Sequence, residues 1–201
     1  MRVTPALLQT IHDAADRTRS ANHGASTKHA LLGSAIREVT RGLGADDLLS
    51  VAAHFREDPE IAVVLLEDVI AAQPNNSRAL VRLANCYWLL GAGPQPVAEL
   101  ANRAIAIDPG DRAAWHLWAL SESQPRERVG RWQQIAQRFP DDMLALANYA
   151  DNAASVAAGE RDYEMLDAAI AAYEGLRARA QRDDERNAVD TALATLRKWR
   201  F

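Results

Sequence analysis

Three prolines recur along the chain at similar spacing, and each one ends an apolar helical segment. Pro74, Pro109 and Pro140 lie 35 and 31 residues apart, in the segments "LLEDVIAAQPNN", "LANRAIAIDPGD" and "WQQIAQRFPDD". Proline cannot continue a helix, because it lacks the amide hydrogen and its ring clashes with the preceding turn. The polar pair that follows each proline supplies an Asn or Asp able to cap the next helix. The spacing therefore predicts a repeated helix–turn–helix unit close to the roughly 34-residue period of known helical repeats.

Apolar residues at helical spacing extend this interpretation to the whole chain. One helix is predicted to begin at Thr4-Pro5, another to run from Leu48 to Phe55, and a further one to begin at Pro59. The later helices are predicted at 77–90, 95–107, 111–122, 125–138, 142–157, 161–180 and 184–200. Since β-branched residues are too few and too scattered for strands, the predicted fold class is all-α.

The segment from Ala79 to Pro109 carries the most complete unit of the repeat. Its first helix shows a large–large–small–aromatic pattern, Gly91 follows at the turn, and small residues precede an Asp-Pro end. The residues that carry this pattern are Leu80, Leu83, Ala84, Tyr87, Ala101, Ala104, Ile105, Ile107, Asp108 and Pro109. In these residues the chain resembles the tetratricopeptide repeat (TPR) family, and the resemblance covers about residues 46–176. It implies a right-handed α-solenoid of antiparallel helix pairs, with flanking helices at both ends.

The predicted organisation is one continuous domain. Residues 1–45 form an N-terminal flanking helical pair, residues 46–180 the TPR-like repeats, and residues 181–201 a C-terminal capping helix. Such flanking helices are expected because a terminal repeat otherwise exposes its apolar face.

The resemblance also implies a function, because in this family the first helices of the pairs line a concave groove that binds peptides or proteins. The positions expected to face the groove are Arg78, Arg82, Asn85, Trp88, His116, Tyr149 and Asn152. Arginine can hold a carboxylate through two parallel hydrogen bonds, asparagine can bond a peptide backbone, and aromatic side chains offer large rigid contact surfaces. The alternative is that Arg78 and Arg82 form a solvated helix face and that Trp88 packs against a neighbour.

One subset of the family holds a C-terminal carboxylate with a Lys/Asn/Arg clamp. The Lys-x-x-x-Asn element of that clamp is absent here, so chaperone-tail binding of that type is not expected. Any clamp in this chain would rest on Arg78 or Arg82 together with Asn85.

Composition excludes several other classes of function. The formal net charge is −4 and the sequence pI is near 5.7, which disfavours binding to nucleic acid through phosphate neutralisation. No basic amphipathic segment indicates a membrane surface, and no apolar run is long enough for a signal peptide or a membrane span. Cys86 is the single cysteine and lies in an apolar helical stretch, so no intrachain disulfide can form. A cytoplasmic protein is predicted, and the preference for Arg and Ala suggests a bacterial, GC-rich genome.

Two alternatives to a non-catalytic interaction module (scaffold, adaptor or assembly factor) remain open at this point. His12 and Asp16 lie four residues apart on one helical face and could share a metal with His23, His29 or His54, as in a small metal-dependent hydrolase. No established metal-binding motif supports this, so no enzyme, cofactor or metal site is predicted. The third hypothesis is a structural homo-oligomer, in which the C-terminal "LRKWRF" of the chain or of a second copy fills the groove.

Overall fold

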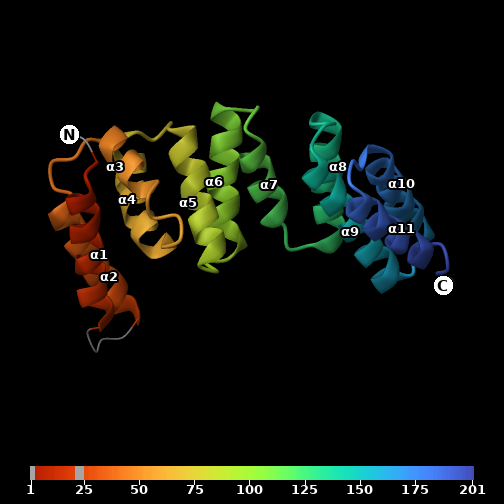
Figure 1. The fold of residues 1–201 in the computed structure, drawn as a ribbon, viewed down its shortest axis with the longest axis horizontal. Coiled ribbons are helices and arrows are strands. Elements are labelled where there is room, and N and C mark those ends of the chain that lie inside the picture. Colours follow the sequence, from red (N-terminus) through yellow and green to blue (C-terminus); the bar gives the residue numbers. More distant parts are fainter. Residues whose placement is uncertain (1–2, 21–24) are drawn as a thin grey trace. The chain divides into compact units, whose positions relative to one another are not determined.

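The protein is a succession of antiparallel helices. A computed structural model describes residues 3–20 and 25–201, and within these ranges it contains eleven helices and no strand. They are α1 (Pro5–Ser20), α2 (Ala25–Val39), α3 (Ala45–Ala52), α4 (Pro59–Ala72), α5 (Ser77–Leu89), α6 (Pro94–Ile107), α7 (Arg112–Leu120), α8 (Pro125–Arg138), α9 (Met143–Glu160), α10 (Tyr163–Arg179) and α11 (Asp183–Leu196). Pairs of consecutive helices pack together, as in an α-solenoid: α1 with α2, α3 with α4, α5 with α6 and α9 with α10 (Figure 1). The predicted fold class is therefore confirmed.

Contacts divide the chain into two compact units, Met1–Leu117 and Trp118–Phe201. The boundary falls within α7, inside the helix pair that the sequence predicts over residues 111–138. The division into a flanking pair, repeats and a capping helix stays a prediction.

The first unit is built around α4. The run Ile61–Leu66 is buried at every position, and Val69 is buried one turn later. The segment "IAVVLL" is apolar on all sides, and a helix of that kind is stable only when neighbours cover it all round. Those neighbours are α3, α5 and α2, while α1 packs on α2 and α6 packs on α5.

The second unit is built around α9, which packs against both α8 and α10. Small residues make this close packing possible, since Ala153, Ala157 and Ala169 are completely buried in one apolar cluster. Leu196 of α11 belongs to the same cluster, and α11 packs along α10. The helix predicted at the C-terminal end therefore covers the apolar face of α10.

The same four-residue turn links one helix to the next at all three prolines. A following proline disfavours the α-helical conformation in the residue before it. Gln73, Asp108 and Phe139 each end a helix outside the α-helical conformation, with φ between −132° and −123° and ψ between 77° and 89°. Three residues later, the backbone N–H donates back to the carbonyl oxygen of that residue, at 3.1, 3.2 and 2.9 Å respectively. The residues that donate are Asn76, Asp111 and Asp142, and their side chains then cap α5, α7 and α9. The predicted proline-ended repeat boundary is confirmed at all three positions.

Arg131 of α8 secures the end of α7 at the start of the second unit. Its Nη1 donates to the carbonyl oxygen of Trp118 at 2.6 Å, and its guanidinium lies 4.5 Å from the centre of the Trp118 ring. Its Nη2 also pairs with a carboxylate oxygen of Glu122 at 2.5 Å. The last carbonyls of a helix lack partners within the helix, and here the Trp118 carbonyl oxygen accepts hydrogen bonds from both Arg131 and the hydroxyl of Ser121, the latter at 2.8 Å.

Two predicted helices end three or more residues earlier than expected. The helix predicted to reach Phe55 ends at Ala52, and the one predicted to reach residue 200 ends at Leu196. In both cases a large aromatic residue leaves the helix to pack: Phe55 is buried after its turn, and Trp199 contacts the apolar cluster of the second unit. Tertiary packing therefore sets these two ends rather than local helical preference.

The C-terminal "LRKWRF" folds back onto its own unit. The backbone N–H of Phe201 donates to the hydroxyl of Tyr163 at 2.8 Å, and the two rings lie 5.1 Å apart. Arg197 also pairs with Glu174 of α10 at 2.7 Å. In this structure the segment proposed as a groove filler is therefore engaged with α10.

In the described ranges, residues 3–20 and 25–201, no helix combines the length and the apolar character needed to cross a membrane.

The cap of α5 provides a direct test of the repeat boundary. Asn76 Oδ1 accepts the N–H of Ala79 at 3.0 Å, so Asn76→Ala is expected to lower the free energy of unfolding by about 1 kcal/mol. Chemical denaturation followed by helical circular dichroism measures this loss. Asn75 is exposed and does not cap the helix, so Asn75→Ala serves as the matched control and should change stability by less than about 0.5 kcal/mol. Equal losses in the two variants would contradict the capping role.

Candidate functional site

One face of α5 presents polar and apolar side chains together. Arg78 and Asn85 are exposed and Arg82 is half-buried, at spacings that place all three on one helical face. Leu89, eleven residues after Arg78, lies on the same face and is 60% exposed. These four residues are called the α5 stripe below. Trp88, at its border, is 42% exposed and therefore does not pack fully against a neighbour.

Arg82 connects the first helices of two consecutive pairs. Its Nη1 donates to the carbonyl oxygen of Leu49 in α3 at 3.2 Å. Burial lowers the pKa of its guanidinium, and the positive charges of Arg78 and Arg56 lower it further. In the described part of the chain, no carboxylate forms an ion pair with any of these three arginines. The stripe therefore carries a local excess of positive charge that an anionic group would relieve.

Cys86, one turn after Arg82, faces the interior. Its side chain is buried, and burial raises the pKa of the thiol. A reactive cysteine needs a lowered pKa and access to solvent, so the structure gives Cys86 a packing role.

The other predicted groove residues lie on other helices than α5. His116 is half-buried on α7, at the end of the first unit. Tyr149 lies on α9 in the second unit and packs against its apolar clusters, where burial raises the pKa of its phenol. The amide of Asn152 donates to the carbonyl oxygen of Asn148 in its own helix at 2.8 Å. The structure brings together Arg78, Arg82, Asn85 and Trp88, and a groove that includes the other three residues stays a prediction.

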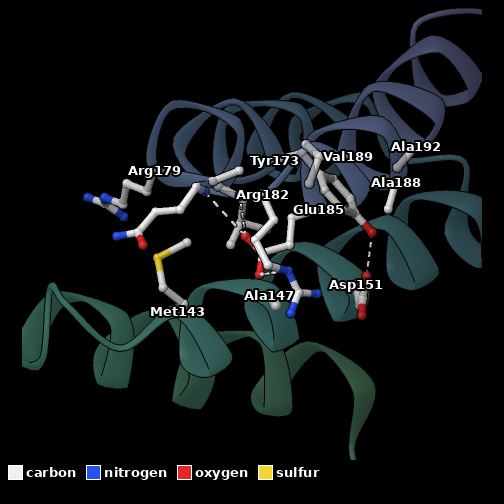
Figure 2. A pocket seen from close by; sticks show the side chains of 13 residues that line it. Met143, Ala147, Asp151, Tyr173, Arg179, Arg182, Glu185, Ala188, Val189 and Ala192 are labelled. Atoms are coloured by element: carbon white, nitrogen blue, oxygen red, sulfur yellow. Dashed lines mark hydrogen bonds and ion pairs between the residues drawn. The ribbon is translucent and has the colours of Figure 1, made fainter.

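The second unit contains a pocket that the sequence did not predict. It has a volume of about 660 Å³ and lies among α9, α10 and α11 (Figure 2). It is called the α9–α11 pocket below. One wall is formed by α9, the opposite wall by α11, and α10 lies between them. The residues that define it are Met143, Ala147 and Asp151 from α9, Tyr173, Leu176 and Arg179 from α10, and Glu185, Ala188, Val189 and Ala192 from α11.

Hydrogen bonds fix several polar groups of this pocket. The hydroxyl of Tyr173 donates to Asp151 Oδ1, which joins α10 to α9 across the pocket (Figure 2). Burial and this carboxylate together raise the pKa of Tyr173 well above the ordinary tyrosine value. At the start of α11, Arg182 pairs with Asp184 at 2.7 Å and with Glu185 at 3.3 Å.

The sequence does contain a signal for this pocket. Met143, Ala147 and Asp151 follow one another at four-residue spacing, as do Ala188 and Ala192. Such spacing predicts that each set shares one helical face, and alanine leaves space where a longer side chain would fill it. What the sequence does not reveal is that these two faces oppose each other.

The pair proposed for a metal site is an exposed surface contact. His12 Nε2 and Asp16 Oδ2 lie 3.9 Å apart, and both side chains are at least half exposed. Among residues 3–20 and 25–201, no group of three or more His, Cys, Asp or Glu side chains is arranged to hold a metal ion. His23 lies outside the described residues.

Comparison with solved structures identifies the fold. The chain is similar to pilF of Pseudomonas aeruginosa, with a TM-score of 0.62 and 13% identity over 96% of this chain and 83% of that one. It is similar to MamA, with a TM-score of 0.58 and 13% identity over 89% and 98% of the two chains. It is also similar to YrrB, described as a TPR protein with an unusual peptide-binding site, with a TM-score of 0.55 and 16% identity over 88% and 92%. No protein-family model and no curated protein sequence matches the chain. The resemblance to the TPR family is therefore confirmed at the level of fold.

The half-buried tyrosine Tyr87 and its carboxylate partner predict a specific dependence of stability on alkaline pH. Tyr87 of α5 donates its hydroxyl hydrogen to Glu67 of α4 at 2.9 Å, and burial together with this carboxylate raises the pKa of Tyr87 to about 12. As the pH rises from about 10 towards about 12, the unfolded chain loses this proton while the folded chain keeps it. The free energy of unfolding should therefore fall over that window, and Tyr87→Phe should weaken the fall.

The ultraviolet absorbance of phenolate measures the titration directly. Subtracting the curve of Tyr87→Phe from that of the unmodified chain isolates Tyr87, and Glu67→Gln should shift the remaining transition to lower pH. A transition of Tyr87 at the ordinary tyrosine value would contradict the buried hydrogen bond.

Proposed function

We propose that this chain, an all-α solenoid with the TPR-type fold, is a non-catalytic module that binds a protein or peptide partner on the surface formed by its first helices. The α5 stripe and Trp88 form the centre of this surface. A peptide-binding site is part of the description of YrrB, one of the structures with the same fold. That likeness supports the class of function, while the chemistry of α5 supports the location.

The observation that carries this proposal is the exposure of large apolar side chains beside unpaired arginines on one helix. Trp88 and Leu89 are 42% and 60% exposed, whereas most apolar side chains of α4 in the same unit are buried. Aromatic and arginine side chains dominate the binding energy of many protein interfaces. A partner that covers Trp88 and Leu89 gains apolar burial, which is the main favourable contribution to association.

The arginines would orient the partner. Arg82 lies within electrostatic range of both Arg78 and Arg56, and Arg78 is exposed, so an acidic side chain of a partner near Arg82 would meet favourable charge from these arginines. Asn85 is exposed between Arg82 and Leu89 and can donate to and accept from a peptide backbone. Apolar contacts would therefore supply affinity, and Arg and Asn contacts would supply orientation.

The proposal assigns no catalytic step and no cofactor to the chain. We also propose that the protein acts in the cytoplasm of a bacterium, because its amino-acid composition favours that location. The acidic net charge of −4 argues against nucleic acid as the partner.

Substitutions on α5 test the location of binding. The partner is first identified by crosslinking in cells, and its affinity for the purified chain is then measured by calorimetry. Trp88→Ala is expected to weaken binding by tenfold or more, and Arg78→Ala by about threefold to tenfold.

Residues of α6 provide matched controls. Ile107 is 41% exposed, close to the exposure of Trp88, and Asn102 is exposed like Asn85. Ile107→Ala and Asn102→Ala should leave the affinity unchanged, because these side chains belong to a second helix of a pair. Equal affinities for Trp88→Ala and Ile107→Ala would exclude the α5 surface as the binding site.

A further inference from the structure

A groove of the first unit lies away from the α5 stripe. It has a volume of about 520 Å³ and is lined by residues of α4, α5 and α6. It is called the α4–α6 groove below. The residues of α5 that line it are Leu83 and Tyr87, which helical spacing places on a different face from Arg82 and Asn85. Because α5 packs against both α4 and α6, these two helices form the walls of the groove (Figure 1).

Apolar side chains line part of the α4–α6 groove. Leu83 of α5 and Leu100 of α6 are almost fully buried, whereas Ile70 of α4 is only half-buried. Ala71, next to Ile70, is exposed and adds a small side chain to the same wall. A ligand that covers the remaining surface of Ile70 therefore gains apolar burial, and the volume of the groove is within the range of small-molecule sites.

The wall formed by α6 carries two opposite charges one helical turn apart, Glu99 and Arg103. Nη2 of Arg103 donates to the carbonyl oxygen of Pro74 at 3.0 Å, and Nε2 of Gln95 donates to Oε1 of Glu99 at 3.1 Å. These bonds hold both charged side chains, yet in the described part of the chain neither of them forms an ion pair. Both are exposed, so each charge is open to a ligand.

The opposite wall carries a further carboxylate, Glu67 of α4, which is already engaged within the protein. Its Oε1 accepts the hydroxyl hydrogen of Tyr87 at 2.9 Å, and its Oε2 lies 3.6 Å from Nη2 of Arg37. Among the described residues that line the groove, Glu99 and Arg103 are therefore the charges that a ligand can pair with.

These contacts describe a small zwitterion. Side chains four residues apart on a helix have Cβ atoms roughly 5–6 Å apart, so the cationic and anionic groups of the ligand must lie close together. An α-amino acid carries an ammonium group and a carboxylate on one carbon atom, and its side chain projects from that same carbon. A residue inside a peptide chain has neither charge, since both groups are then amides.

We propose that the α4–α6 groove binds a free α-amino acid with an aliphatic side chain. The carboxylate of the ligand pairs with Arg103, its ammonium group donates to Glu99, and its side chain lies against Ile70 and Leu83. The site is separate from the surface of the proposed function and does not depend on it.

Leucine and its analogues test each contact by NMR titration of the isotope-labelled, full-length chain. L-Leucine should bind saturably and shift the signals of Ile70, Leu83 and Arg103. L-Leucinamide lacks the carboxylate and N-acetyl-L-leucine lacks the ammonium group, so each should bind about threefold to tenfold more weakly. Glycine lacks the aliphatic side chain and should bind about tenfold more weakly.

The handedness of the ligand gives a test that nonspecific attraction between charges does not pass. Three separate contacts with the groups on one tetrahedral carbon distinguish a molecule from its mirror image. D-Leucine should therefore bind more weakly than L-leucine, although the two have the same charge and the same apolar surface. Equal affinities would show that fewer than three contacts are made and would overturn the proposal.

Protein variants test the two charged contacts from the other side. Glu99→Gln and Arg103→Gln should each weaken binding of L-leucine by about threefold to tenfold. Glu57→Gln and Arg17→Gln remove the same charges at exposed positions of the first unit outside the groove, so they are the matched controls and should bind as the unmodified chain does. N-Acetyl-L-leucine has no ammonium group, so it should lose no affinity for Glu99→Gln.

Filling the groove separates binding inside it from general surface effects. Ala71→Leu places a larger side chain in the groove and should abolish binding of L-leucine. Ala106→Leu makes the same change at an exposed position of α6 outside the groove and should leave binding unchanged. Circular dichroism verifies that each variant is folded, and only folded variants are compared.

Three further results would overturn the proposal. One is the absence of saturable binding of L-leucine at millimolar concentration, and another is equal binding of L-leucine, its amide and its acetyl derivative. The third is equal affinity of Arg103→Gln and Arg17→Gln for L-leucine. Trp88→Ala changes a residue outside the groove and should not alter the affinity for L-leucine, so failure here is distinct from failure of the proposed function.

Discussion

The helix-ending turn at proline is the constraint on which the architecture depends. At Pro74, Pro109 and Pro140 the preceding residue leaves the α-helical conformation, and the residue two positions after proline both closes the turn and caps the next helix. After Pro74 and Pro140 the next helix packs against the one before it, α5 against α4 and α9 against α8. Small buried residues such as Ala79, Ala104 and Ala145 then allow the close approach.

The two candidate surfaces differ in physical character. The α5 stripe is exposed, with arginines that repel one another and with Trp88 and Leu89 only partly covered. The α9–α11 pocket is concave and mostly apolar, and the charged groups that line it are Asp151, Arg179, Arg182 and Glu185. The exposed stripe is physically suited to a broad contact in which charge sets the orientation.

Much of the fold could be predicted because the relevant signals are local. The capping roles of Asn76, Asp111 and Asp142 act within three residues, and the apolar run of α4 reveals its burial directly. The helices predicted to reach Phe55 and residue 200 end early for the same reason, since Phe55 leaves its helix to become buried and Trp199 leaves its helix to pack on an apolar cluster. Of the predicted groove residues, the four on α5 share one region because they share one helix, whereas Tyr149 packs into the interior of the second unit.

The sequence by itself determined the helix boundaries at the three prolines, because proline and the capping side chains act on the backbone beside them. It also determined which faces of those helices are apolar, through the spacing of their residues. Only the tertiary structure decided which faces oppose each other. Ala147 and Ala188 are far apart in the chain, and their small size produces a pocket only because α10 holds α9 and α11 on either side of it. That separation depends on packing among three helices, and no local pattern encodes it.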